Sequence, residues 1–136
     1  MREQLISFET AIIAKEKGFD VKTERFYNEQ LKSLGYYSSN EDTSAKNHNI
    51  YKENFSAPTQ SLLQKWLREK MDMWITINFD GMTYSISIYG RYTPDGGEME
   101  ITNTGSEEFA DRYFLRYEQA LEIGLQETLK LINLKP

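Results

Sequence analysis

The chain has 136 residues, no cysteine and a formal net charge of −5, and this length suits a single domain with a core of its own. The absence of cysteine excludes disulfides, zinc–thiolate sites and thiol nucleophiles, and it fits a reducing compartment. The negative charge argues against broad binding to nucleic acid through phosphates. No window approaches the ~20 apolar residues of a membrane span, and the N-terminus lacks a signal-peptide pattern, so we expect a cytoplasmic protein without membrane contact.

The first predicted element is a short amphipathic helix in the stretch "FETAIIAKEK" after Ser7. Ser7 suits the N-cap, because its hydroxyl can accept one of the helix's unpaired backbone N–H groups. Gly18 suits the left-handed residue that ends a helix, with Phe19 folding back onto the last turn. We therefore expect a capped helix between these residues.

The next forty residues are harder to interpret. Residues 20–38 are compatible with a strand or a short helix, and the sequence leaves both open. The polar residues 39–54 predict a solvated loop with a short element near Ile50 and Tyr51. The single histidine, His48, lies in this stretch, and we expect it to be an ordinary surface residue.

A second helix is predicted in "SAPTQSLLQKWLREK", residues 56–70. Ser56 is the expected N-cap, and Pro58 falls in the first turn, where its missing N–H is harmless. One apolar stripe is expected to face the core, with Trp66 as its anchor: Leu62, Leu63, Trp66 and Leu67. The opposite side carries Gln60, Gln64, Lys65 and Arg68.

A β-hairpin follows, because "MWITINF" and "MTYSISIY" alternate between apolar and polar residues on either side of "DG". Asp-Gly predicts a type I′ turn, which would place Phe79 opposite Met82 and, further along, Ile77 opposite Tyr84. The expected core face consists of Met73, Ile75, Ile77, Phe79, Met82, Tyr84, Ile86 and Ile88. The other face, here called the polar face, consists of Trp74, Thr76, Asn78, Thr83, Ser85, Ser87 and Tyr89.

A third strand, "EMEITNT", is expected to turn Met99 and Ile101 to the core and Glu98, Glu100 and Thr102 to the polar face. The last element is the helix "YEQALEIGLQETLKLI". Its predicted buried stripe consists of Tyr117, Leu121, Leu125, Thr128 and Ile132. Gly124 lies beside this stripe, and we expect it to permit close packing against the sheet.

The predicted fold class is therefore α+β: a three-stranded antiparallel meander in α-β-β-β-α order, with the helices on one face. We expect one domain over residues 1–136. Residues 1–55 would form an N-terminal helix and polar loop extension, and residues 56–136 the α-β-β-β-α core.

The sequence offers little for catalysis. A Ser-His-Asp arrangement would have to use His48, and metal sites usually need several His, Cys or spaced carboxylates. Glu98 and Glu100 could pair as carboxylates, but solvated acids on an edge strand explain them as well, since charge deters edge pairing. "PDGGE" lacks the Lys-Ser/Thr of a phosphate loop. We expect no enzyme, no cofactor and no metal.

Two surfaces remain as candidates for binding. The first is the polar face, whose uncharged donors and acceptors and flanking aromatic residues suit a protein partner or a second copy of the chain: Trp74, Thr76, Asn78, Ser85, Ser87 and Tyr89. An ordinary solvated antiparallel face is the other interpretation of the same alternation. The second surface is the basic side of the middle helix, Lys65, Arg68 and Lys70, which would suit nucleic acid.

Three blocks, "ISFETAIIAKEKGF", "SAPTQSLLQKWLREK" and "YEQALEIGLQETLKLI", resemble in this order a family of small uncharacterised proteins of Bacteroidetes genomes and their phages or mobile elements. No activity is known for that family. The resemblance therefore implies a phage or mobile-element origin and leaves the function open. With the surfaces above, we expect a non-enzymatic binding or interaction protein.

Two looser resemblances concern topology. The α-β-β-β-α order is similar to that of double-stranded RNA-binding domains, which implies a nucleic-acid-binding accessory protein. Those domains carry lysines at the start of the last helix, where this chain has Glu118 and Glu122. The last helix after a meander is also similar to that of HicB-type antitoxin domains, which implies a small antitoxin-like domain that binds a partner.

Overall fold

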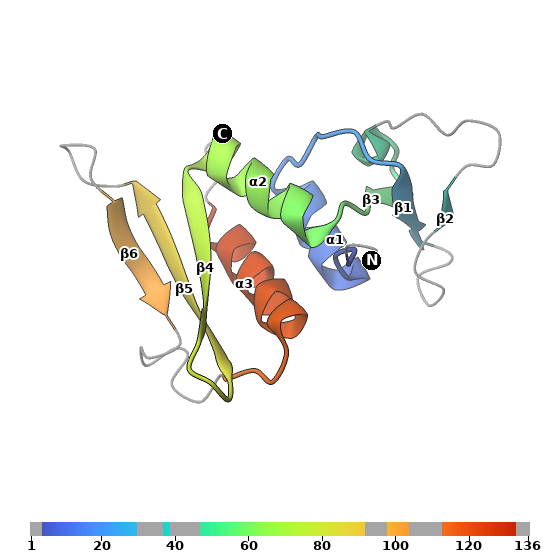
Figure 1. Cartoon of the computed structure of the whole chain (residues 1–136). Coiled ribbons are helices and arrows are strands. Elements are labelled where there is room, and N and C mark those ends of the chain that lie inside the picture. Colours follow the sequence, from blue (N-terminus) through green and yellow to red (C-terminus); the bar gives the residue numbers. More distant parts are fainter. Residues whose placement is uncertain (1–3, 30–36, 39–46, 92–97, 104–112, 133–136) are drawn as a thin grey trace.

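The computed structural model describes residues 4–29, 37–38, 47–91, 98–103 and 113–132, and these residues form an α+β fold, which confirms the predicted class (Figure 1). In chain order the elements are α1 (Phe8–Glu16), β1 (Arg25–Asn28), β2 (Tyr37–Ser38), the 3-10 helix η2 (His48–Ile50), β3 (Asn54–Ser56), α2 (Gln60–Met71), β4 (Met73–Phe79), β5 (Tyr84–Arg91), β6 (Glu98–Asn103) and α3 (Tyr117–Leu131).

The larger sheet has the strand order β4-β5-β6, and both pairings are antiparallel. Figure 1 shows α2 and α3 on one side of this sheet, and α3 packs across β4 and β5. A register shift interrupts the β5–β6 pairing between Ile88 and Tyr89. The predicted orientations of Glu98, Met99, Glu100, Ile101 and Thr102 concern side chains outside the described residues.

The β4–β5 hairpin differs from its prediction at the turn. Phe79 pairs with Tyr84, and Asp80 N–H donates to the carbonyl of Thr83 at 3.1 Å, so Gly81 and Met82 form the tip. Of these two, Gly81 alone has a positive φ (99°), whereas a type I′ turn needs positive φ at both central residues. The Asp80 carboxylate accepts the N–H groups of Met82 and Thr83 at 2.8 and 2.7 Å, which stabilises this turn.

The shift moves every cross-strand pair by two residues, so Ile77 lies opposite Ile86. Because side chains alternate with a period of two, a shift of two residues leaves each side chain on its predicted face. Ile86 and Ile88 are fully buried, as expected. Phe79 and Met82 were expected in the core and instead are 60% and 83% exposed, because they lie at the end of the hairpin.

The ambiguous stretch 20–38 contains two strands of a second sheet, with the order β2-β1-β3 and antiparallel pairing. This small sheet lies at the far end of the molecule from β6 (Figure 1). The segment just before α1 is fixed next to it: Ile6 N–H donates to the carbonyl of Pro58 at 3.0 Å, and the Tyr27 hydroxyl donates to the carbonyl of Ile6 at 2.5 Å. These contacts join the predicted N-terminal extension to the start of α2.

Helix α1 has the predicted caps. The Ser7 hydroxyl accepts the N–H of Thr10 at 3.2 Å. Gly18 has φ +91°, and the N–H of Phe19 donates to the carbonyl of Ala14 at 3.0 Å. This is the hydrogen bond that a left-handed residue at a helix end allows, so the local sequence signal was sufficient.

Helix α2 begins later than predicted. Its N-cap is Thr59, whose hydroxyl accepts the N–H of Leu62 at 3.2 Å. Ser56 does not cap the helix, since it ends β3 and its hydroxyl accepts the N–H of His48 at 3.1 Å. Trp66 is 4% exposed and contacts the ring of Phe19 at 5.3 Å between centroids, which confirms its role as a core anchor.

Leu121, Leu125 and Thr128 of α3 and Ile132 at its C-cap are buried as predicted. Tyr117 was expected in the buried stripe and is instead 43% exposed, because it begins the helix at the edge of the covered area. The role predicted for Gly124 is confirmed. A Cβ at this position would lie 3.0 Å from Cγ2 of Ile75, so an added methyl group would require this side chain to move by a few tenths of an ångström.

The prediction of a surface His48 is wrong. The side chain is 3% exposed, its Nε2 lies 3.0 Å from the carbonyl oxygen of Thr23, and its ring stacks on Phe26 at 4.3 Å. The short element expected near Ile50 exists as η2 and begins at this histidine. A polar stretch of sequence therefore supplies a buried ring, since the packing partner comes from β1.

Candidate functional site

The six polar-face residues predicted for partner binding form three cross-strand pairs of β4 and β5. Trp74 lies opposite Tyr89, Thr76 opposite Ser87, and Asn78 opposite Ser85. The structure thus brings together all six residues predicted for partner binding. Figure 1 shows α2 and α3 on the other side of the sheet, and these six residues carry no charge.

Exposure is uneven across the polar face. Thr76 and Asn78, on the outer strand β4, are exposed, whereas Ser87 on the central strand is 7% exposed. The Asn78 amide donates to the Ser87 hydroxyl at 3.3 Å. Trp74 and Tyr89 are half-buried, and Trp74 already takes part in an interaction. The accessible donors and acceptors of the face are therefore concentrated along β4.

The basic residues of α2 do not form one patch. Lys65 and Lys70 are exposed and Arg68 is half-buried. In an α-helix, residues five positions apart point about 140° away from each other, so Lys65 and Lys70 face different directions. Glu69 lies about 40° from Lys65 on the same helical wheel. Only Lys65 and Arg68 share a side of α2, which is a weak footprint for phosphate binding.

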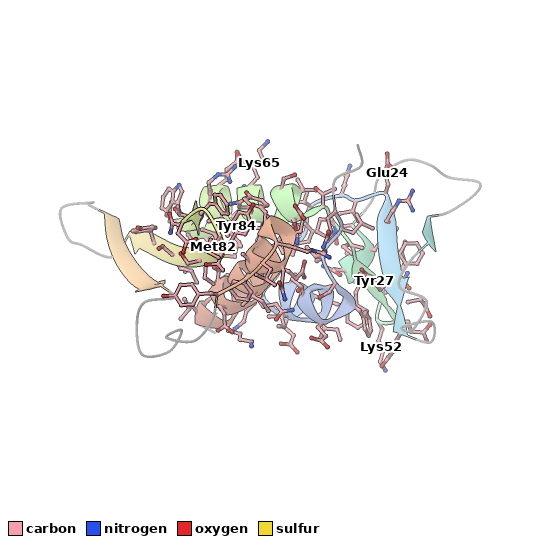
Figure 2. The ribbon with its side chains drawn as sticks, turned by 60° about the horizontal axis from the view of Figure 1, so that its bottom comes forward. Glu24, Tyr27, Lys52, Lys65, Met82 and Tyr84 are labelled. Atoms are coloured by element: carbon pink, nitrogen blue, oxygen red, sulfur yellow. The ribbon has the colours of Figure 1, made fainter. Side chains whose placement is uncertain are left out.

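Sequence reasoning missed an exposed apolar area at the end of the hairpin, here called the apolar tip. Its members are Phe79, Met82 and Tyr117, of which Met82 is 83% exposed. Figure 2 places Met82 and Tyr84 close together in the half of the molecule that contains the larger sheet. The rings of Phe79 and Tyr84 lie 4.8 Å apart. The apolar side chains on the helix-covered face of the sheet thus continue past the first turn of α3. The alternation of apolar and polar residues in the strands does not show where a covering helix begins.

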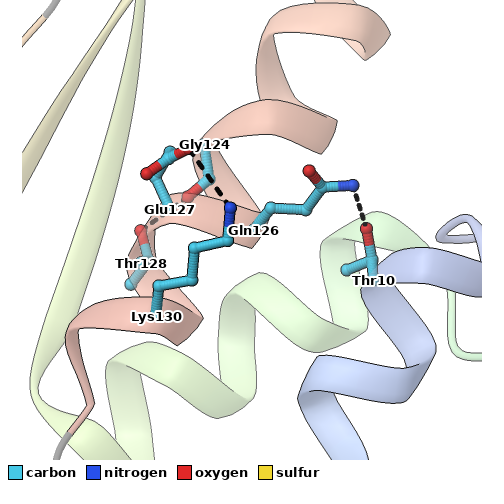
Figure 3. A network of polar contacts seen from close by, with 6 residues as sticks. All are labelled: Thr10, Gly124, Gln126, Glu127, Thr128 and Lys130. Atoms are coloured by element: carbon cyan, nitrogen blue, oxygen red, sulfur yellow. Dashed lines mark hydrogen bonds and ion pairs between the residues drawn. The ribbon is translucent and has the colours of Figure 1, made fainter. Parts of the chain in front are cut away.

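A polar junction joins α1, α2 and α3 around the carboxylate of Glu122. This carboxylate accepts the N–H of Ser7 at 2.9 Å, the hydroxyl of Thr10, and the side-chain amide of Gln60 at 2.9 Å. Gln126 donates to the Thr10 hydroxyl at 2.9 Å (Figure 3). Every one of these groups is used in holding helices together, so the junction is structural.

Gln60 was expected on the solvent side of α2 and is instead 4% exposed. Its amide also donates to the carbonyl of Glu118 at 3.0 Å. The buried amide is stable there because α3 supplies its acceptors. The sequence of α2 does not predict this burial, because the acceptors belong to α3, more than fifty residues later in the chain.

Among the residues that the structure describes, two groups have clearly shifted pKa values. Burial lowers the pKa of Lys15, and the negative charge of Glu29 partly opposes this. The Lys15 ammonium donates to the carbonyls of Tyr51 at 2.6 Å and Asn54 at 2.8 Å, and lies 4.6 Å from the centroid of the Phe55 ring. This lysine therefore clamps the turn before β3.

The second shifted group is Asp80. The N–H groups of Thr83 and Met82 hold the pKa of its carboxyl below the usual range. The same N–H groups form the hairpin turn, so the shift reflects local structure. Neither Lys15 nor Asp80 faces a second titratable group in an arrangement suited to proton transfer.

Among the described residues, no group of three or more His, Asp or Glu side chains could hold a metal ion. The helices in the described ranges include none that is long and apolar enough to cross a membrane.

No family model, no curated protein and no solved structure matches this chain. The function is therefore inferred from the surfaces of the molecule itself.

Proposed function

We propose that this protein is a non-enzymatic binding protein, of phage or mobile-element origin, that contacts a protein partner through the polar face. The observation that carries the proposal is the position of this face: α2 and α3 cover the opposite side of the sheet, while Thr76 and Asn78 are exposed on this one. Hydroxyl and amide groups without charge can pair with a partner's backbone or side chains at little desolvation cost compared with charged groups.

Two further features support a protein rather than a nucleic acid as the partner. Aromatic residues, Trp74 and Tyr89, form the pair at one end of the face, and aromatic side chains are enriched at protein interfaces. The six residues of the face include no lysine or arginine, and phosphate contacts dominate affinity for nucleic acid.

The proposal is tested by affinity capture from native bacterial lysate, with and without nuclease, read by mass spectrometry. The bait is compared with Ser85→Arg, in the cross-strand pair at one end of the polar face, and with Gln119→Arg, which adds the same charge on the exposed side of α3. We expect one protein to be recovered by the wild type and by Gln119→Arg in both samples, and to be lost with Ser85→Arg.

Equal recovery by Ser85→Arg would overturn the proposal. Material that disappears on nuclease treatment would do so as well, and it would shift attention to Lys65 and Arg68, the two basic residues that share a side of α2. A salt-dependent mobility shift that Lys65→Glu abolishes would then identify nucleic acid as the ligand.

A further inference from the structure

We infer that the outer edge of β4 is a self-association site, at which residues 76–80 pair antiparallel with the same residues of a second copy. This goes beyond the proposed function, because it uses the edge of the sheet rather than the polar face. Since β4 is an outer strand in the order β4-β5-β6, one side of its backbone is directed away from β5.

The hydrogen bonds around β4 establish which residues point outward. In an antiparallel ladder, successive residues direct their N–H and C=O groups alternately toward the neighbouring strand and away from it. Asp80 N–H bonds to the carbonyl of Thr83, toward β5. Asn78 and Thr76 therefore also bond toward β5, while Phe79, Ile77 and Ile75 direct their groups outward.

Two independent contacts agree with this alternation. The Gln64 side chain reaches the carbonyl of Ile75 from outside the sheet at 3.2 Å. Tyr84, which lies opposite Phe79, exchanges both of its backbone hydrogen bonds with Phe114, at 2.7 and 2.9 Å, on the side away from β4. The outward direction of Ile77 and Phe79 follows.

Only the first half of the edge is covered. The Gln64 side chain donates to the carbonyl of Ile75. Figure 1 shows that α2 lies close to the first residues of β4 and diverges from the rest of the strand. Thr76, Asn78 and Phe79 are exposed and Ile77 is half-buried. Within the described part of the chain, no hydrogen bond reaches Ile77 or Phe79 from outside the sheet, so a strand of about four residues could add there.

The sequence of β4 favours another copy of itself as the occupant. "MWITINF" has no charged residue and no proline. Proteins normally use charged residues and proline to protect exposed sheet edges. The sequence of β6, at the other edge, carries Glu98 and Glu100. Antiparallel self-pairing of β4 brings no like charges together, and identical strands offer matching donors and acceptors.

The free stretch also fixes the register. With Ile75 occupied, Ile77 pairs with Phe79 of the second copy and Phe79 with its Ile77, which gives two reciprocal pairs of backbone hydrogen bonds. The two-fold axis then passes between the two copies of Asn78. On the helix side of the sheet, Phe79 packs against Ile77 of the second copy, which would cover the ring that is 60% exposed in one chain.

Disulfide trapping tests this register, because the native chain has no cysteine. Asn78→Cys places two thiols in a non-hydrogen-bonded pair with Cα atoms about 4.5 Å apart, within the range of a disulfide. The matched control is Thr76→Cys on the same strand and face. Its copies lie opposite residue 80 and are about 14 Å apart. Both positions are exposed, so both variants should fold.

Under mild oxidation we expect Asn78→Cys to form a covalent dimer about tenfold or more faster than Thr76→Cys, because pairing raises the effective thiol concentration. The wild type should show a concentration-dependent rise toward twice the monomer mass in sedimentation, and Ser85→Arg, away from the edge, should keep it. Equal trapping rates, faster trapping of Thr76→Cys, or a wild type that stays monomeric at high concentration would overturn the inference.

Discussion

The three-helix junction around Glu122 and the second half of β4, here called its outer half, differ in how their polar and apolar groups are exposed. At the junction, buried and half-buried polar groups of three helices come together, and hydrogen bonds pair them. At the outer half of β4, apolar Phe79 and uncharged Thr76 and Asn78 are exposed, on a strand whose outer backbone side no described residue occupies beyond Ile75. The groups at the junction stabilise the fold through their hydrogen bonds. The exposed side chains of β4 contribute little to the stability of the monomer.

The largest expected difference lies within one row of the sheet. Ile86→Ala removes a fully buried side chain that packs near Gly124, and we expect it to lower the free energy of unfolding by about 2–5 kcal/mol. Phe79→Ala, on the same face of the sheet, should cost less than about 1 kcal/mol, because the ring is 60% exposed. Urea denaturation of dilute protein measures both. Equal losses would mean that the exposed end of the row is part of the core.

The junction predicts a smaller effect. Glu122→Ala leaves the N–H of Ser7, the hydroxyl of Thr10 and the amide of Gln60 without their shared acceptor. We expect a loss of about 1 kcal/mol, the lower end of the usual range, because Glu122 is half-buried and water can replace part of the contact. Hydrogen exchange at the Ser7 amide should also become faster.

The control for this prediction is Glu118→Ala, one turn earlier in α3. Gln60 uses the backbone carbonyl of Glu118, which the substitution keeps. The variant should leave exchange at Ser7 unchanged and cost only a few tenths of a kcal/mol through the helix dipole. If both variants altered Ser7 exchange equally, the junction would not depend on the Glu122 carboxylate.

The smallest expected effect concerns the hairpin turn and depends on pH. The pKa of Asp80 is lowered in the folded protein by the N–H groups of Thr83 and Met82. The folded state therefore stabilises the charged carboxylate more than the neutral carboxyl. Its contribution to stability should be present above about pH 4 and disappear as the pH falls through the folded-state pKa. Titration of the Asp80 carboxyl by NMR measures the pKa, and Asp80→Asn should remove this part of the acid dependence. A midpoint at or above the ordinary value would contradict the turn geometry.

How far the sequence predicted the fold depended on the distance between interacting residues. The caps of α1 and the close approach at Gly124 were predicted, because Ser7, Gly18 and the helical periodicity are local signals. The hairpin register was wrong by two residues, since the side chain of Asp80 stabilises a tip at Gly81 and Met82 rather than occupying the turn. The faces of the strands were nevertheless correct, because a shift of two residues preserves side-chain direction.

The candidate site shows the same division. The six residues of the polar face were predicted together from alternation, and the register pairs them across β4 and β5. The apolar tip was missed, because its exposure depends on where α3 begins to cover the sheet. The buried positions of His48 and Gln60 were missed because their partners, Thr23 and Glu122, come from distant parts of the chain.

The amino-acid sequence by itself determined the α+β class, the helix α1 with its caps, the two faces of the hairpin and the close packing at Gly124. These features depend on interactions within a few residues or on the fixed periods of helix and strand. The tertiary structure alone decided which polar groups are buried, which apolar groups are exposed and which strand edge stays open. Burial is a property of what packs against a residue, and here the packing elements lie tens of residues away.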